Sequence, residues 1–280
     1  MHPELVQFGP IHVRSYGLLL AISFLLGVLY IWWVTKKQRQ PFEPYLTIAY
    51  IMTIGGIIGA RLFYVLFHLE EFKGNWGATF NPFASGEFGI AGLNLYGGIL
   101  VAVVGSFAYA RWKKPPVLEI FDYFTPTLGL GLFFTRIGCF LNGCCFGTPT
   151  GLPWGVSFPE GSLPFYVFGS AHLHPSQLYS SLYGAFLFLL MHYIITHRKF
   201  VGQATALFFM IEAGFRYGIE YVRYYEDEMH FTVGSTHPTY NQVISLGLFL
   251  LGLGIYLYQS RRARTHPAKD TPARAERAHS

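Results

Sequence analysis

Long apolar runs separated by short polar stretches dominate this chain of 280 residues. Seven runs are long enough to cross the roughly 30 Å hydrocarbon layer of a bilayer as helices. They cover residues 14–35, 45–68, 91–110, 118–135, 175–196, 201–222 and 239–259. The pattern predicts an all-α polytopic membrane protein with seven transmembrane helices.

Basic residues follow the odd-numbered runs and thereby predict the orientation. Basic clusters follow the first, third, fifth and seventh runs, for example Lys36-Lys37 and Lys113-Lys114. Together these four clusters contain 14 of the 20 Lys and Arg residues. Because basic loops stay in the cytoplasm, the N-terminus is expected outside and the C-terminus in the cytoplasm.

The loops predict one membrane domain over residues 1–262 with a small cap on its outer face. The cap would come from the loops at about 69–90 and 136–174, which are rich in Gly and in Asn or Pro, with a short strand at 153–158. The charged Ala/Pro-rich tail, 263–280, is expected to be disordered and cytoplasmic.

Composition supports this class. Hydrophobic residues make up 52% of the chain and charged residues 12%, against about 25% charged residues in soluble domains. The pI near 9.0 does not indicate nucleic acid, because the excess charge lies in loops and tail. Cys139, Cys144 and Cys145 form neither a disulfide framework nor a metal motif, so we expect small apolar residues in a tight turn and no metal or cofactor.

Five arginines lie within or beside the apolar runs: Arg14, Arg61, Arg136, Arg216 and Arg223. A charge at membrane depth is costly and usually faces a cavity or a partner, so each is a functional candidate. Arginine also keeps its charge when buried, and its planar fork matches phosphate or carboxylate.

The densest candidate cluster begins at Thr135-Arg136 and ends at Gly147, where the fourth run stops. Glycines such as Gly143 supply free backbone N–H donors, Asn142 adds an amide, and Arg136 adds fixed positive charge. This composition indicates an anion-binding turn. The alternative is a Gly-rich exit loop with an arginine that reaches toward the surface.

A second cluster combines Glu212, Arg216, Glu220 and Arg223. Spacings of four, four and three place them on one face of the sixth predicted helix. That face should turn to the bundle interior, where the charges either bind a ligand or form a structural ion-pair ladder.

Three further residues are candidates. His174 precedes Pro175 at a helix start and could transfer a proton or cap the helix. Tyr96 stands before Gly97-Gly98, which suits close helix packing with a hydroxyl in a cavity. Tyr16-Gly17 is a weaker signal, since Tyr at a span end is usually interfacial.

Together these motifs resemble the bacterial phosphatidylglycerol–prolipoprotein diacylglyceryl transferases over about residues 10–260. The resemblance rests on Tyr16-Gly17, Gly59-Ala-Arg61, Gly97-Gly98, Arg136 through Asn142-Gly143 to Gly147, His174-Pro-Ser-Gln-Leu-Tyr179, Arg216 with Glu220 and Arg223, and Gln242 with Ser245.

The resemblance implies a multi-pass transferase of the bacterial inner membrane that begins lipoprotein biosynthesis. It would move a diacylglyceryl group from phosphatidylglycerol to the lipobox cysteine thiol of a prolipoprotein signal peptide, and glycerol 1-phosphate would leave. It implies essential roles for Arg136 and Arg216. The substrate site would also include Asn142, Gly143, Glu220, Arg223, Tyr16 and Arg61.

The chain departs from the family pattern at the proton-accepting part of that site. The family usually has His where Tyr96 stands, and Gly, Asn and Glu at Thr135, Cys139 and Cys144. Tyrosine, with a pKa near 10, is a poor base. We therefore expect His174 to accept the thiol proton, unless the arginine charges alone generate the thiolate.

Two other functions stay open. A transporter or scramblase of anionic lipid or phosphate compounds could use the same arginines, although the chain shows no inverted repeat. A non-catalytic lipid-binding relative would fit the changes at Tyr96, Cys139 and Cys144.

Overall fold

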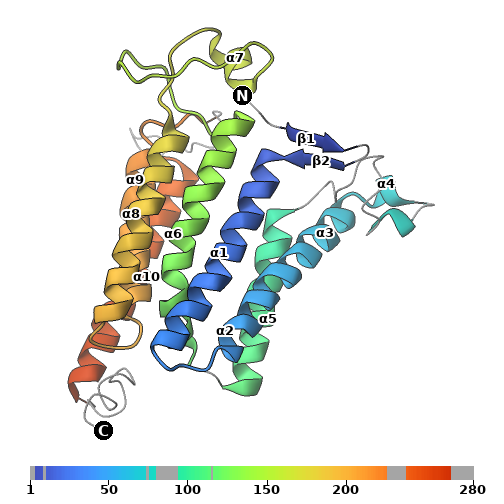
Figure 1. Cartoon of the computed structure of the whole chain (residues 1–280). Helices are drawn as coiled ribbons and strands as arrows, with labels where there is room; N and C mark the ends of the chain where they lie inside the picture. Colours follow the sequence, from blue (N-terminus) through green and yellow to red (C-terminus); the bar gives the residue numbers. More distant parts are fainter. Residues whose placement is uncertain are drawn as a thin grey trace. The chain divides into compact units, whose positions relative to one another are not determined.

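The computed structural model describes residues 4–8, 11–73, 76–79, 94–114, 116–225 and 238–265. Helices account for most of this part of the chain (Figure 1). In order, the elements are β1 (Glu4–Phe8), β2 (Ile11–Arg14), α1 (Ser15–Lys37), α2 (Glu43–Tyr50), a π-helical turn (Ile51–Gly55), α3 (Gly56–Phe67), α4 (Leu69–Phe72), a 3₁₀ turn (Trp76–Thr79), α5 (Leu95–Lys113), α6 (Val117–Asn142), α7 (Leu163–Phe168), α8 (Ser176–His197), α9 (Gln203–Ile219) and α10 (Tyr240–Thr265). The antiparallel hairpin β1–β2 is an addition to the predicted helical pattern.

Five helical stretches in the described residues are long and apolar enough to cross a membrane. They are Ser15–Lys37, Glu43–Phe67, Val117–Asn142, Ser176–His197 and Tyr240–Thr265. The two other predicted runs are also helical, as α5 and α9. The polytopic helical class is therefore confirmed, while the number of seven spans and their orientation stay predictions.

The helices turn large apolar side chains outward, as a protein in lipid should. Leu25, Phe107, Leu182 and Leu250 are examples of exposed residues near the middle of their helices. The buried positions include small and polar side chains, such as Ser181 and Thr205. Helix association in lipid relies on this kind of close contact between small residues.

The chain divides into two compact units. The first contains Ser15–Tyr30 and Phe121–Ser280, and the second contains Glu4–Arg14 and Ile31–Ile120. In the first unit α6 and α8 meet backbone to backbone: a Cβ added at Gly129 would lie 2.5 Å from the Phe188 nitrogen. Glycine at this position thus allows α6, which carries Arg136, to lie beside α8, which begins two residues after His174.

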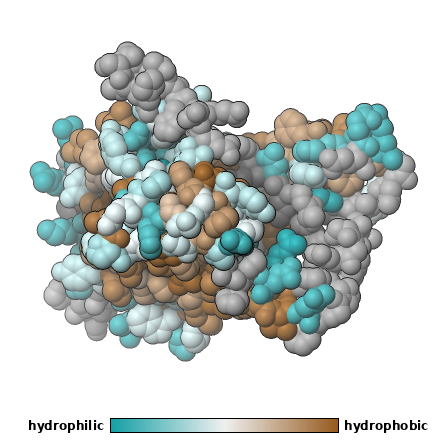
Figure 2. All heavy atoms as spheres, turned by 90° about the horizontal axis from the view of Figure 1, so that it is seen from above, coloured by the Kyte–Doolittle hydropathy of each residue, from teal (hydrophilic) through white to brown (hydrophobic). Residues whose placement is uncertain are grey.

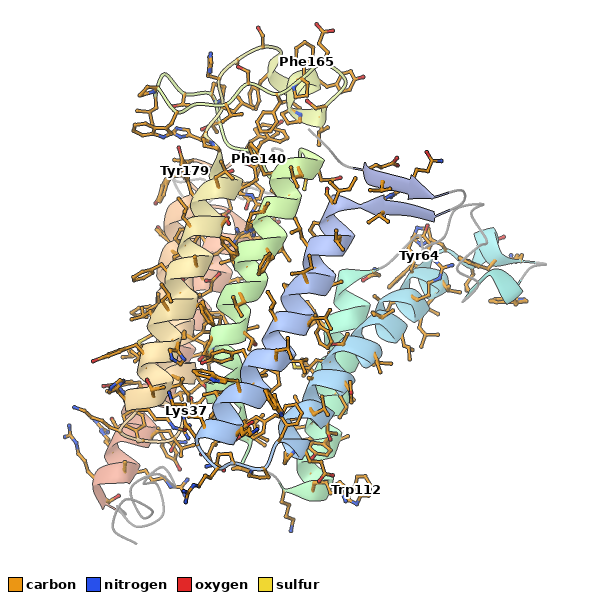
Figure 3. The ribbon with its side chains drawn as sticks, viewed as in Figure 1. Lys37, Tyr64, Trp112, Phe140, Phe165 and Tyr179 are labelled. Atoms are coloured by element: carbon orange, nitrogen blue, oxygen red, sulfur yellow. The ribbon has the colours of Figure 1, made fainter. Side chains whose placement is uncertain are left out.

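In the second unit α3 packs on α5 through glycines. A Cβ at Gly98 would lie 2.9 Å from the Gly56 carbonyl oxygen, which confirms the close helix packing expected from Gly97-Gly98. Lys37 and Trp112 lie at one end of this unit and Tyr64 at the other (Figure 3). The lysine-rich ends of α1 and α5 therefore lie at the same end of this unit.

A buried carboxylate fixes the start of α9. Asp122 is fully buried and accepts hydrogen bonds from Arg198 Nη1 at 2.8 Å, from the Gly202 and Thr205 backbone nitrogens at 2.7 and 2.8 Å, and from Thr205 Oγ1 at 2.8 Å. Arg198, which the sequence analysis counted only as a cytoplasmic loop charge, is a buried partner of this acid. Asp122 therefore caps a helix distant from it in the chain.

The segment from Gly143 to Pro175, with α7, forms a cap at one end of the first unit (Figure 1). Its core is Phe146, Phe158 and Leu173, and Phe165 of α7 belongs to the same cap (Figure 3). Seen from above, hydrophilic and hydrophobic residues are mixed on this surface (Figure 2). The strand predicted at 153–158 is wrong: a turn there is followed by one isolated bridge between Val156 and Leu173.

Other predicted boundaries also shift. The loop predicted at 136–174 starts later, because α6 continues to Asn142. Helix α10 reaches Thr265, beyond the boundary predicted at residue 262, and the rest of the predicted tail lies outside the described residues. The predicted loop at 69–90 contains α4 and the 3₁₀ turn, and its remainder is likewise outside the described part.

Candidate functional site

The end of α6 is shaped by a left-handed glycine. Gly143 has φ of 72°, its backbone nitrogen donates to Phe140 O at 3.2 Å, and the Cys144 nitrogen donates to Cys139 O at 3.1 Å. These two bonds form a Schellman motif, which ends a helix at a residue that favours glycine. The expected anion-binding turn is thus preceded by helix, and Arg136 belongs to α6 itself.

Helix α8 holds the turn that follows. Ser176 Oγ donates to the Cys145 carbonyl oxygen and Gln177 Nε2 donates to the Cys144 carbonyl oxygen, both at 2.9 Å. Ser176 and Gln177 are buried. These carbonyls are therefore already bound, as are the Gly143 and Cys144 N–H groups at the end of α6, so hydrogen bonds fix the turn from both sides.

Gly147 lies between two segments that are far away in the chain. Its backbone nitrogen donates to His174 O at 3.1 Å, and it forms an antiparallel bridge with Arg223. A Cβ at Gly147 would lie 2.5 Å from both the His174 Cβ and the Val222 carbonyl oxygen. Glycine is therefore required here, and through it the fold joins the His174 and Arg223 segments.

The predicted one-face ladder on the sixth helix holds only in part. Helix α9 ends at Ile219 with Glu220 as its C-cap, so Arg223 lies in the bridge to Gly147 and not on the helix face. Glu212 and Arg216 do share that face. The Glu212 carboxylate lies within electrostatic range of Arg216 and Arg136.

Glu220 is the centre of a polar network. It pairs with Arg216, Nη2 to Oε1 at 3.1 Å, and accepts from Tyr225 OH at 2.6 Å and Thr239 Oγ1 at 2.8 Å. Asn241 Nδ2 also donates to it, at 3.3 Å. Burial, and then the bond to Glu220, raises the pKa of Tyr225, so its hydroxyl keeps the proton that it donates.

Arg136 and Arg223 have a different environment from Arg216. Arg136 forms no hydrogen bond or ion pair with any residue that the structure describes. The Nε of Arg223 is buried without a hydrogen-bond partner, while its guanidinium lies 5.0 Å from the ring centre of Tyr225. Arg216 differs from them because its Nη2 contacts both Glu220 and Tyr225, whereas Arg136 and Arg223 form no ion pair with a described acid.

These two arginines act on the same turn. Contacts with the Cys139 and Cys144 thiols, and then the charges of Arg223 and Arg136, lower the pKa of the Cys145 thiol despite its burial. Arg223 and Arg136 therefore both lie within electrostatic range of Cys145. Asn142, predicted as an amide ligand, is exposed at the end of α6 beside Cys144.

His174 has a defined partner. Its Nδ1 lies 3.3 Å from the Tyr179 hydroxyl, which accepts from Trp154 Nε1 at 2.8 Å. A phenolic oxygen can accept twice, so Nδ1–H can donate to Tyr179 and leave the Nε2 lone pair open. That tautomer suits a base. Tyr179 lies at the cap end of α8 (Figure 3).

Tyr16 joins this group from α1. A Cβ at Gly138 would lie 3.1 Å from the Tyr16 Cα, so glycine allows α1 to approach α6 two residues after Arg136. The Tyr16 hydroxyl lies within electrostatic range of Arg136. The first unit therefore brings together Tyr16, Arg136, Gly143, His174, Arg216, Glu220 and Arg223 at its cap end.

Comparison with known proteins shows the family of the chain. A family model described as prolipoprotein diacylglyceryl transferase matches residues 3–258. The chain belongs to this family. Among relatives named phosphatidylglycerol–prolipoprotein diacylglyceryl transferase, that of Nitratidesulfovibrio vulgaris (strain Miyazaki F) is 31% identical over 276 residues, or 95% of this chain and 96% of the relative. Those of Clostridium tetani and Thermotoga maritima are also 31% identical, over 94% and 90% of this chain and 99% and 82% of the relatives.

Two predicted residues of this diacylglyceryl transferase lie in the second unit. Arg61 is buried in α3, 5.1 Å from the Phe72 ring centre and 5.6 Å from that of Tyr64. Tyr96 belongs to the first turn of α5, and its side chain lies outside the description. Their predicted roles in the transferase site stay predictions.

The sequence reasoning missed Tyr225, Thr239 and Asn241. Each binds Glu220, yet none stands at a helical spacing from it. The signal available was a buried Glu in an apolar region, which needs hydrogen-bond donors beyond one arginine. Tyr179 stood in a recognised motif, but its contact with Trp154 depends on the fold of the cap.

Proposed function

We propose that this chain transfers the diacylglyceryl group of phosphatidylglycerol to the lipobox cysteine thiol of a prolipoprotein in the bacterial inner membrane. A C–S bond forms to the glycerol carbon, and the C–O bond from that carbon to phosphate breaks. Glycerol 1-phosphate leaves with the electron pair, and the thiol proton passes to a base. Family membership and the names of the relatives support this reaction.

The observation that carries the proposal is the meeting of Arg136 and Arg223 at one turn. Both charges act on Cys145, and neither is paired with an acid among the described residues. Negative charge grows on the phosphate oxygens as the C–O bond breaks. Fixed guanidinium groups in a water-poor site stabilise such charge strongly.

Arg216 has a supporting role in this arrangement. Its pairing with Glu220 and Tyr225 fixes the end of α9, from which the chain continues to Arg223. Arg216 still presents part of its surface, since a quarter of its side chain is exposed. We therefore assign phosphate binding to Arg136 and Arg223, with Arg216 at the edge of the site.

His174 is the proton acceptor that the geometry supports. It lies on the segment bonded to Gly147, whose other side carries Arg223. Tyr179 holds its Nδ1, so Nε2 is left to face the thiol. A thiol is most reactive as thiolate, and the adjacent positive charge lowers the cost of forming it.

The test is a reconstituted reaction. The purified full-length chain receives phosphatidylglycerol and a lipobox peptide, and mass spectrometry follows the diacylglyceryl-peptide while glycerol phosphate is assayed. A peptide with Ser in place of the lipobox Cys is the matched control. Absence of product, under conditions in which a family member with His at the Tyr96 position is active, would favour lipid transport or simple lipid binding instead.

A further inference from the structure

The cysteines of this chain converge at the end of α6. Only three cysteines occur in the sequence, and all are free. Their Sγ atoms lie within 4.8 Å of one another. The proposed phosphatidylglycerol chemistry uses none of these thiols, because its nucleophile is the thiol of the substrate.

The Schellman motif explains why two of the thiols meet. Cys139 and Cys144 occupy the two positions whose side chains touch when a helix ends in this way, as the bond from the Cys144 nitrogen to Cys139 O records. The third thiol is brought in by backbone conformation: Cys145 has φ of 61°. A left-handed residue other than glycine costs about 1–2 kcal/mol, so the surroundings must hold it.

Those surroundings are rigid. The carbonyls of Cys144 and Cys145 accept from Gln177 and Ser176, two buried residues at the start of α8. Cys139 is itself buried, and Cys144 and Cys145 are half-buried. The sulfurs are thus positioned before any ligand arrives, and two of them can be reached from outside.

We propose that Cys139, Cys144 and Cys145 form a three-thiolate site for a soft monovalent metal ion of the Cu(I) class. With metal–sulfur distances of about 2.3 Å, as in thiolate sites, three sulfurs around one ion lie about 4 Å apart. The observed separations need only small side-chain rotations to reach that geometry. Soft thiolate ligands favour Cu(I), whereas structural zinc sites use four ligands, one more than the described residues supply.

The nearby charges fit such an ion. Three thiolates and one monovalent cation leave two negative charges, and Arg136 and Arg223 are the two cations that act on Cys145. Metal and lipid phosphate would then compete for the same arginines. This last consequence rests on the proposed function, whereas the metal site does not.

The experiment measures binding directly. The full-length protein in detergent, kept anaerobic, is titrated with Cu(I) in competition with bicinchoninate, and thiolate-to-copper absorption is recorded in the ultraviolet. We expect one Cu(I) per chain. Cys145→Ser should weaken binding more than about 100-fold, since the loss of a ligand exceeds the loss of an outer contact. The triple Cys→Ser variant measures the background from His and Met.

Three outcomes would overturn the site. The triple variant could bind Cu(I) as tightly as the native chain. Acid quenching of intact cells, followed by maleimide labelling in denaturant, could reveal one free thiol per chain, which means a disulfide. Equimolar Zn(II) could displace Cu(I), which means a four-coordinate site. Should Cys139→Ser fail to fold, Cys144→Ser and Cys145→Ser still decide, and none of these readouts depends on transferase activity.

Discussion

Arg216 and Glu220 form an ion pair across one turn at the end of α9, with Nη2 3.1 Å from Oε1. The Glu220 side chain is fully buried, and its oxygens bind three further side chains. Its charge is thus already compensated. Glu220 thus pairs with Arg216, whereas Arg136 and Arg223 form no ion pair with an acid that the structure describes.

Glu220→Gln should destabilise the protein by about 2–3 kcal/mol. Breaking a fully buried pair costs about 3–5 kcal/mol, and the partial exposure of Arg216 reduces that cost. Thermal unfolding in detergent measures the effect, with Glu160→Gln, an exposed position in the cap, as the control. Equal unfolding temperatures for the two variants would contradict a structural role of the network.

Arg136→Lys should be nearly as damaging as Arg136→Ala, with each reducing transfer about 100- to 1000-fold. A lysine ammonium is a point charge and cannot replace the bidentate fork that binds two phosphate oxygens. Initial rates with saturating peptide measure this, and Arg264→Lys, exposed at the far end of α10, is the control. Near-native activity of Arg136→Lys would show that charge alone suffices.

His174→Ala should reduce the rate by about 100-fold or more, because proton transfer contributes roughly that much. The loss should be larger in this chain than in relatives that retain His at the Tyr96 position. Tyr179→Phe, which removes the partner of Nδ1 and the acceptor of Trp154 Nε1 but keeps the imidazole, should cause a smaller loss. If His174→Ala costs the same in both kinds of protein, His174 is not the substitute base.

Gly147→Ala should destabilise the cap by about 1–3 kcal/mol, the usual cost of overpacking, and should reduce transfer as well. The new methyl group would press on His174 and the Val222 carbonyl. Gly151→Ala is a close control, because a Cβ there meets no atom within 4 Å. Similar stability and activity of the two variants would contradict the requirement for glycine at position 147.

Asp122→Ala should lower stability by about 3–5 kcal/mol, since it breaks the buried ion pair with Arg198 and removes the cap of α9. Removing both partners should cost less than the sum of the single changes. Denaturant unfolding of the two single variants and the double variant gives the coupling. Strict additivity would mean that the pair contributes nothing of its own.

Local sequence patterns predicted much of the helical structure. Apolar run length located every long helix, and Gly97-Gly98 correctly indicated a close helix contact. Helix ends were less accessible: residues 136–142 looked like a Gly-rich loop, but Thr135 and Arg136 continue α6 until a left-handed residue becomes possible at Gly143. Helical periodicity likewise extended α9 too far, to Arg223.

Contacts between distant segments could not be predicted from the spacing of residues along the chain. The hydrogen bonds of Asp122 to the α8–α9 connection and of Thr239 to Glu220 link residues with no sequence relation. The three cysteines looked like small apolar residues of a turn, and only the backbone conformation shows their sulfurs together. The arginines were recognisable because a charged residue within an apolar run is visible in the local sequence. Their partners come from distant segments and are not visible there.

The position of Gly147 between His174 and Arg223 has a consequence for how the protein is made. The ribosome makes the segment from Arg136 to Gly147 first. The His174 segment that bonds to Gly147 follows just before α8, and the Arg223 segment follows only after α9. A growing chain therefore contains the residues that match the family motif before the segments that contact Gly147 have all been made. A gene truncated after α8 would still encode the residues from Arg136 to Gly147 that match the family. Its product would lack Arg223, the bridge partner of Gly147.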